Sequence, residues 1–130
     1  MATFKESLPL LATAHLWPQS LANGASNQLT GHWAKVGKGR KYVALCMTAT
    51  LSAGAATYQF FGAEDADGTG GDAIAGTLVH TAAESIGYLY LDSTLVVATH
   101  PYITIKCTTS GGGTGICGAA VFALDPAYSG

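Results

Sequence analysis

The stretch YVALCMTATL, residues 42–51, decides the fold class of this 130-residue chain. It has no charged residue, and its side chains alternate between two faces with the period of two that is typical of a β-strand. One face consists of Val43, Leu45, Met47, Ala49 and Leu51, and the other of Tyr42, Ala44, Cys46, Thr48 and Thr50. The first of these faces is wholly apolar, so we expect it to lie over the core.

Further apolar stretches of strand length follow at short intervals, separated by Gly, Asp-Gly and Pro. No segment shows a convincing amphipathic helix pattern. This spacing predicts an all-β fold, an antiparallel β-sandwich or barrel of jelly-roll or immunoglobulin-like topology. The expected strands are residues 57–63, 77–81, 86–91, 95–99, 102–108 and 116–124, with a Gly/Asp-rich loop at 64–76.

The N-terminal residues differ from the rest of the chain, because Pro18 and Asn23-Gly24 interrupt them. We expect an extended arm over residues 1–30, with a short helical or irregular piece at 3–14, that leads to a first strand near 27–33. The β-sandwich domain then covers 31–124, and residues 125–130 form a C-terminal tail.

The last two strands allow a specific pairing to be predicted. If residues 108–115 form a hairpin loop, Ile103 faces Val121, Ile105 faces Ala119 and Cys107 faces Cys117, all on one inward face. The two cysteines are then either a disulfide or two small buried apolar side chains, and a reducing compartment favours the second interpretation. Three cysteines are too few for a secreted disulfide framework.

The composition is poor in charge and rich in small residues. Six basic and eight acidic residues stand against 54 that are Ala, Gly or Thr, and the net charge of −2 disfavours nucleic-acid binding. Polar residues interrupt the uncharged residues 42–63, so we expect no membrane span. Such a surface is better suited to extensive contact with other proteins than to solvated catalysis.

The few charges form two clusters of opposite sign. Both clusters are either solvated loops or complementary patches that guide copies of the chain, or a partner, into register. We predict the second role, and the candidate partner-binding residues are Lys35, Lys38, Arg40 and Lys41 in the basic cluster, and Glu64, Asp65, Asp67 and Asp72 in the acidic cluster.

The remaining motifs do not indicate an enzyme. Residues 65–76 resemble a calcium loop, but position twelve is Gly76, where an EF-hand has a bidentate Glu. The glycine-rich residues 110–115 lack the Lys-Ser/Thr of a phosphate loop, and no His or Cys pair has zinc spacing. We therefore predict no catalytic residue, metal or cofactor. Aromatic residues could line a sugar-binding face, although packing is the default for Trp17, Trp33, Tyr42, Tyr58, Phe60, Tyr88, Tyr90 and Tyr102.

The order of these features resembles a family of small phage head proteins encoded beside the major capsid protein. The similarity is one of pattern, and it covers residues 29–124. It lies in LTGH at 29–32 after the arm, the apolar strand at 42–51, TYQF at 57–60, the acidic turn EDADG at 64–68, and the closing strands at 102–107 and 117–124.

This resemblance implies a capsid decoration, or cement, protein that is made in the bacterial host cytoplasm. Copies would bind the major capsid protein on the outer surface of the virion, as homotrimers, and stabilise the junctions between capsomers. The alternatives are a phage neck or tail structural protein and a carbohydrate-binding β-sandwich module.

Overall fold

The computed structural model describes residues 12–21, 26–28, 33–35, 41–69, 71–92 and 100–124. These residues form strands and turns, and no helix occurs among them. The strands are β1 (Ala12–Leu21), β2 (Ser26–Gln28), β3 (Ala34–Lys35), β4 (Lys41–Leu51), β5 (Ala55–Ala63), β6 (Asp72–His80), β7 (Ser85–Asp92), β8 (Tyr102–Ser110) and β9 (Gly115–Leu124).

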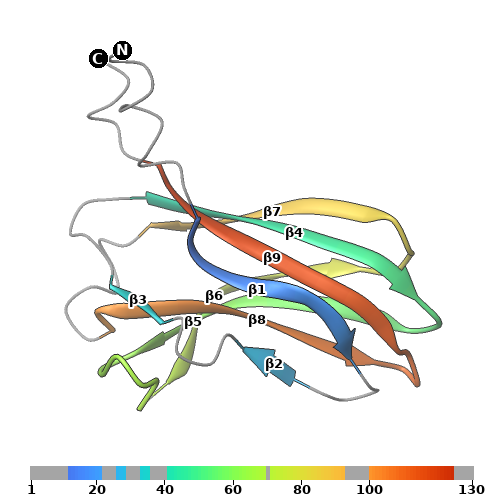
Figure 1. Ribbon diagram of the computed structural model, residues 1–130, viewed down its shortest axis with the longest axis horizontal. Coiled ribbons are helices and arrows are strands. Elements are labelled where there is room, and N and C mark those ends of the chain that lie inside the picture. Colours follow the sequence, from blue (N-terminus) through green and yellow to red (C-terminus); the bar gives the residue numbers. More distant parts are fainter. Residues whose placement is uncertain are drawn as a thin grey trace.

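The strands form two antiparallel sheets packed face to face (Figure 1). The first sheet has the order β1-β9-β4-β7, and the second has the order β2-β8-β5-β6, with β3 also paired to β8. The first strand thus pairs with the last, β2 and β3 with the last but one, β4 with β7 and β5 with β6, which is the pairing of a jelly roll. The predicted all-β antiparallel sandwich is confirmed, and the strand order selects the jelly roll over the immunoglobulin-like alternative.

The predicted strands at 42–51, 57–63, 77–81, 86–91, 102–108 and 116–124 correspond to β4 to β9. One boundary is wrong, because β6 already begins at Asp72, inside the predicted 64–76 loop. Residues 1–11, 95–99 and 125–130 lie outside the described part, so the arm, the strand at 95–99 and the tail stay predictions. Strands β1 and β2 lie within residues 1–30, where the sequence predicts an arm.

The face of β4 that was expected to cover the core points outward instead. Tyr42, Ala44, Cys46 and Thr48 are buried, whereas the apolar side chains at 43, 45, 47 and 49 are half-buried or exposed. The reason lies in the second sheet, whose Tyr58, Phe60, Ile103 and Ile105 are fully buried and fill most of the space between the sheets. The interior is close-packed, so the side chains of β4 that face these large groups, Ala44, Cys46 and Thr48, are small.

The predicted hairpin between the last two strands is also wrong. β8 belongs to the second sheet and β9 to the first, so residues 111–114 carry the chain from one sheet to the other. The predicted inward face is nevertheless correct, since Ile103, Ile105, Cys107, Cys117, Ala119 and Val121 are all buried. They meet across the core, and their actual register partners are on β5 and β4: Cys107 pairs with Tyr58, and Cys117 pairs with Thr48.

Two crossings between the sheets touch each other through glycines. Gly54 in the β4–β5 turn and Gly111 in the β8–β9 turn both have φ of 68°. A Cβ atom on Gly54 would lie 1.8 Å from the carbonyl oxygen of Ser110 and 2.9 Å from the Cα of Gly111. Only glycine combines this backbone conformation with so close an approach, so the two turns hold one end of the sandwich together.

Candidate interaction surface

The outward side of the first sheet carries most of the exposed apolar side chains of the described residues. Tyr90 is 68% exposed, Ile86 66% and Tyr88 59%, all on β7, and Met47 on the neighbouring β4 is 42% exposed. We name this surface the apolar outer face and define it as Val43, Leu45, Met47, Ile86, Tyr88, Tyr90, Ile116, Gly118, Ala120 and Phe122.

Strand register arranges these residues in rows across three strands. Leu45 pairs with Tyr88 on one side and Ala120 on the other; the rows on either side of it are Phe122–Val43–Tyr90 and Gly118–Met47–Ile86. Because side chains directly opposite on adjacent strands are neighbours, the rows merge into one continuous patch. No member of the patch carries a charge or a hydrogen-bonding side chain other than the two tyrosine hydroxyls.

The outward side of the second sheet is different. Its central rows contain polar side chains, with Gln59 paired to Lys106 and Thr77, and Thr57 paired to Thr108. The Nζ of Lys106 lies 4.2 Å from the centre of the Phe61 ring, so a cation covers the aromatic group there. Burial lowers the pKa of Lys106. The apolar outer face is therefore a property of one sheet, not of the whole surface.

The described members of the two charged clusters lie at one end of the sandwich. Lys41 is the first residue of β4. After β4 the chain makes one turn and β5 runs back in the opposite direction, so the acidic loop that follows β5, residues 64–71, lies at the same end as Lys41. Lys35 pairs with Tyr102, which on its other side pairs with Ala63. Lys38 and Arg40 lie outside the described residues. The fold thus brings together six predicted site residues that stand far apart in the sequence.

The acidic loop at this end is held by Trp33 and by its own hydrogen bonds. The buried indole of Trp33 lies directly against Gly68, where a Cβ would come within 2.6 Å of its Nε1. The backbone N–H and the hydroxyl of Thr69 both donate to Asp67, at 2.9 and 2.6 Å, and these bonds lower the pKa of Asp67.

Asp72 at the far side of the loop interacts with His100. The His100 Nε2 lies 3.4 Å from Asp72 Oδ2. Among the described residues no salt bridge joins the basic cluster to the acidic one. The described members of both clusters have exposed side chains, so they can reach another molecule.

A polar network bridges the two sheets inside the core. The hydroxyl of Thr48 on β4 lies 3.0 Å from the Tyr58 hydroxyl and 2.8 Å from His80 Nδ1, and Tyr58 donates to the carbonyl of Met47. Burial raises the pKa of Tyr58 and lowers that of His80. The His80 Nε2 is buried and has no hydrogen-bond partner. A neutral, desolvated network of this kind fixes the sheets relative to each other.

The three cysteines are free thiols in the core. Burial raises the pKa of Cys46 to about 12, and burial together with the neighbouring Cys117 side chain raises that of Cys107. A thiol that is not ionised at neutral pH is a poor nucleophile and a poor metal ligand. The Cys117 side chain is near enough to affect the pKa of Cys107, so the predicted proximity of these two cysteines is correct. The strand pairing from which it was predicted is wrong.

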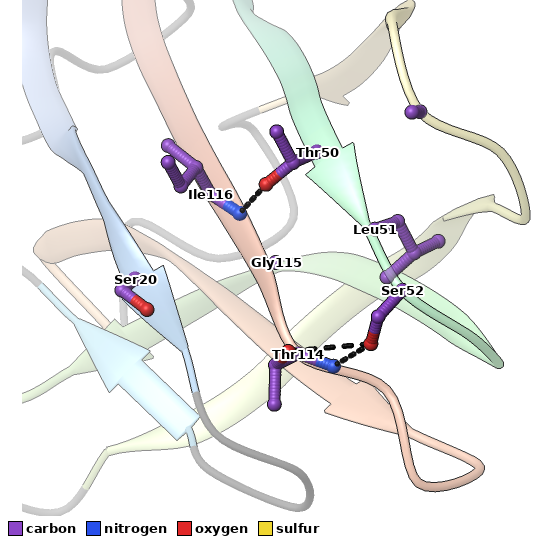
Figure 2. A pocket seen from close by; sticks show the side chains of 8 residues that line it. Ser20, Thr50, Leu51, Ser52, Thr114, Gly115 and Ile116 are labelled. Carbon is purple, nitrogen blue, oxygen red and sulfur yellow. Dashed lines mark hydrogen bonds between the residues drawn. The ribbon is translucent and has the colours of Figure 1, made fainter.

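An open hollow lies at the opposite end of the sandwich from the charged loops. It has a volume of about 430 Å³ and contains mainly hydroxyl and apolar groups (Figure 2). Ser52 accepts a hydrogen bond from the Thr114 backbone N–H at 2.9 Å, and Thr50 accepts one from that of Ile116 at 3.0 Å. These hydroxyls therefore hydrogen-bond to the backbone. No titratable side chain lines the hollow, so the hydroxyls have no general base beside them. It is lined by Ser20, Thr50, Leu51, Ser52, Ala83, Thr114, Gly115 and Ile116.

Two further features are absent from the described residues. No three His, Cys, Asp or Glu side chains are grouped so that they could hold a metal ion, and this includes Asp65, Asp67 and Asp72 of the loop with calcium-like spacing. No helix in this part of the chain is long and apolar enough to cross a membrane.

Comparison with known proteins adds little. No protein-family model and no curated protein matches the sequence. Among solved structures, the chain is similar to one described as "Bacillus endospore appendages form a novel family of disulfide-linked pili", with 15% identity over 86% of this chain and 90% of that one, and a TM-score of 0.41. A likeness of this size carries no argument about function.

Reasoning from the sequence missed the apolar outer face. It assigned the side chains at 43, 45 and 47 to the core and treated the aromatic residues as packed. Trp33, Tyr42, Tyr58 and Phe60 are indeed buried, but Tyr88 and Tyr90 are exposed. A signal was present, because 86–91 has apolar or aromatic side chains on both faces and 42–51 is uncharged on both, while only one face of a strand can point into a two-layer core.

Proposed function

We propose that this protein is a non-enzymatic structural component of a phage particle, a capsid decoration protein that binds the outer shell and stabilises capsomer junctions. The observation that carries the proposal is the apolar outer face. Contiguous apolar patches of this kind mark protein contact sites, and a chain with so few charges offers little else to a ligand. The phage setting comes from the resemblance of residues 29–124 to small head proteins.

The jelly roll is compatible with this role but does not establish it. Viral capsid proteins and lectins both use the fold, and function depends on the site, not on the fold. The charged end adds support, because exposed charges can orient the protein on a partner. A decoration protein needs both elements, an apolar contact for affinity and charges for register.

A carbohydrate-binding module is the second candidate, and the exposure of Tyr88 and Tyr90 favours it, since sugar rings stack on aromatic side chains. Sugar sites also need precisely placed polar groups. Val43, Leu45 and Ile86 beside these tyrosines are apolar. Lys41 lines a hollow together with Tyr90, but one cation is not the set of polar groups that a sugar site needs. Protein contact therefore explains the surface better.

Quantitative mass spectrometry of purified particles from the source tests the proposal. We expect a copy number that is close to that of the major capsid protein, or a simple fraction of it set by shell symmetry. About ten copies per particle would assign the chain to the neck or tail. Absence from particles would contradict a virion role, and a glycan array would then test the second candidate.

A further inference from the structure

We propose that a second copy of this chain covers the apolar outer face, through a two-fold symmetric contact of that face with itself. This inference rests on the proposed function in one respect, that another protein chain covers this face. It assigns a second copy to the face and leaves the charged end of the sandwich as the surface toward the shell. Three features of the described residues support it: the absence of charge, the distribution of apolar side chains and the open edge at β7.

The first feature concerns charge. In a two-fold contact each residue meets the same surface on the partner, so any charge on the face would meet a like charge nearby. The apolar outer face has none between Lys41 at one end and the hollow at the other. It can pack on a copy of itself without electrostatic cost, whereas the polar rows of the second sheet, with Lys106, cannot.

The second feature is where the apolar side chains lie. Six large apolar side chains of the described residues are exposed, and five of them are on the outward side of the first sheet: Met47, Ile86, Tyr88, Tyr90 and Ile116. The sixth, Val79, stands on the outward side of the second sheet. A head-to-tail contact needs a second, different apolar patch to receive the first. A lone valine does not provide one, so within the described part of the chain the face itself is the apolar patch that can receive it.

The size of the face fits the centre of such an interface. Eight register pairs join β4 to β7, which at ~3.4 Å per residue and ~4.8 Å per strand gives the three strands an area of about 400 Å². A standard interface buries about 800 Å² on each partner, with an apolar core inside a polar rim. The face supplies that core, and the surrounding ends of the sheet supply the rim.

The third feature is that β7 forms one edge of the first sheet, so its outer backbone groups have no neighbouring strand among the described residues. Edge strands of soluble proteins usually carry Lys, Pro or a bulge that prevents pairing with another chain. Residues 85–91 contain no charge and no proline, and their pairing with β4 is regular. A strand of this kind is open to pairing with another chain, which adds to the case for a protein partner at this side of the sheet.

The test measures self-association of the full chain by analytical ultracentrifugation across a range of concentrations. We expect wild type to sediment as a dimer and Tyr88→Lys and Met47→Lys to weaken the dimer by tenfold or more, because each places two like charges in an apolar interface. Val79→Lys is the matched control: it makes the same change at a 49% exposed position on the other sheet and should leave the dimer unchanged. Thermal unfolding of each variant establishes that it is folded.

A mixing experiment tests the symmetry. Tyr88→Lys and Tyr88→Glu chains should each be monomeric alone and should form a heterodimer when mixed, since only a face that meets itself brings the two substitutions together. A monomeric or trimeric wild type, disruption by Val79→Lys, or no recovery on mixing would overturn the inference.

These outcomes are separable from those of the proposed function. A monomer that is nevertheless present in particles in shell-like copy number would leave the proposed function standing and remove the inference. A dimer that behaves as expected but is absent from particles would leave the inference standing and contradict the proposed function.

Discussion

The hydroxyl of Thr48 lies 2.8 Å from Nδ1 of His80, and this buried contact joins the two sheets. Thr48 also lies 3.0 Å from the hydroxyl of Tyr58, which donates to the carbonyl of Met47. Because the Tyr58 proton is used on Met47, Thr48 must donate to Tyr58 and accept from the Nδ1–H of His80. The buried Nε2 of His80 is then unprotonated. Protonation would place a charge on that unpartnered atom.

We therefore predict that the protein loses stability in mild acid because of His80. Burial lowers the pKa of His80 below its usual value of 6.5, so the stability that the neutral imidazole contributes is present above pH 6.5 and is lost as the pH falls through the lower, folded-state value. Urea unfolding at pH 7 and pH 5 should show a smaller free energy of unfolding at pH 5. In His80→Phe, which keeps a ring against Tyr58, this difference should shrink; an equal difference would contradict the assignment.

Two buried threonines should respond in opposite ways to replacement by valine. Thr48→Val removes the hydroxyl that satisfies His80 and should destabilise the protein by about 1–3 kcal/mol. The hydroxyl of Thr104 is equally buried but has no hydrogen-bond partner, so Thr104→Val removes an unsatisfied group and should be neutral or stabilising. Denaturant unfolding of both variants measures the difference, and equal losses would refute the network.

Gly54→Ala should be among the most damaging single-methyl changes in the chain. It adds the strain of an L-residue at positive φ, about 1–2 kcal/mol, to a contact of 1.8 Å with the Ser110 carbonyl. Gly76→Ala is the matched control, because no atom lies within 4 Å of its Cβ position, and it should change the free energy of unfolding by less than about 1 kcal/mol. Melting temperatures of the two variants give the comparison.

The thiols should resist alkylation while the protein is folded. With the pKa of Cys46 at about 12 and that of Cys107 also raised by burial, neither is a thiolate at pH 8. Iodoacetamide followed by intact-mass measurement should find no label on the native protein and three labels after unfolding in urea. Rapid native labelling would mean that the core opens far more readily than its packing implies.

Charge reversal tests the role of the basic cluster. Lys38, Arg40 and Lys41 changed to Glu should abolish binding to the shell or assembly, because the acidic loop at the same end would then meet like charge on a neighbour. The circular dichroism spectrum should not change, since the Lys41 side chain is exposed. Assembly that is unaffected by the reversal would refute complementary patches.

Alternation along the chain predicted the strands well, because a period of two is a local property. It could not predict which side of β4 points inward. Val43, Leu45 and Met47 are more apolar than Ala44, Cys46 and Thr48, yet the smaller set is buried because Tyr58 and Phe60 of the opposite sheet occupy the space. That choice depends on how the residues of β5 pack across the core, which the alternation within β4 does not show.

The same limit explains the β8–β9 error. A glycine-rich link after Ser110 suits a hairpin and a crossing between sheets equally, and the partner strands β5 and β4 decide between them. The candidate site could likewise be predicted only in part. The clusters of charge were visible in the sequence, and the fold gathers their described members at one end, whereas the apolar outer face became visible only once the orientation of β4 was known.

The place of β9 in the first sheet has a consequence for synthesis. β9 follows every other described strand along the chain, yet it lies between β1 and β4. Leu21 must wait for Gly115, about a hundred residues later, before β1 gains its partner. At ~5–20 residues per second the ribosome takes roughly 5–20 s to make that stretch. From its own synthesis to the end of this time β4 lacks a neighbour on one side, so the nascent chain must be kept from pairing with others until its last strand has emerged.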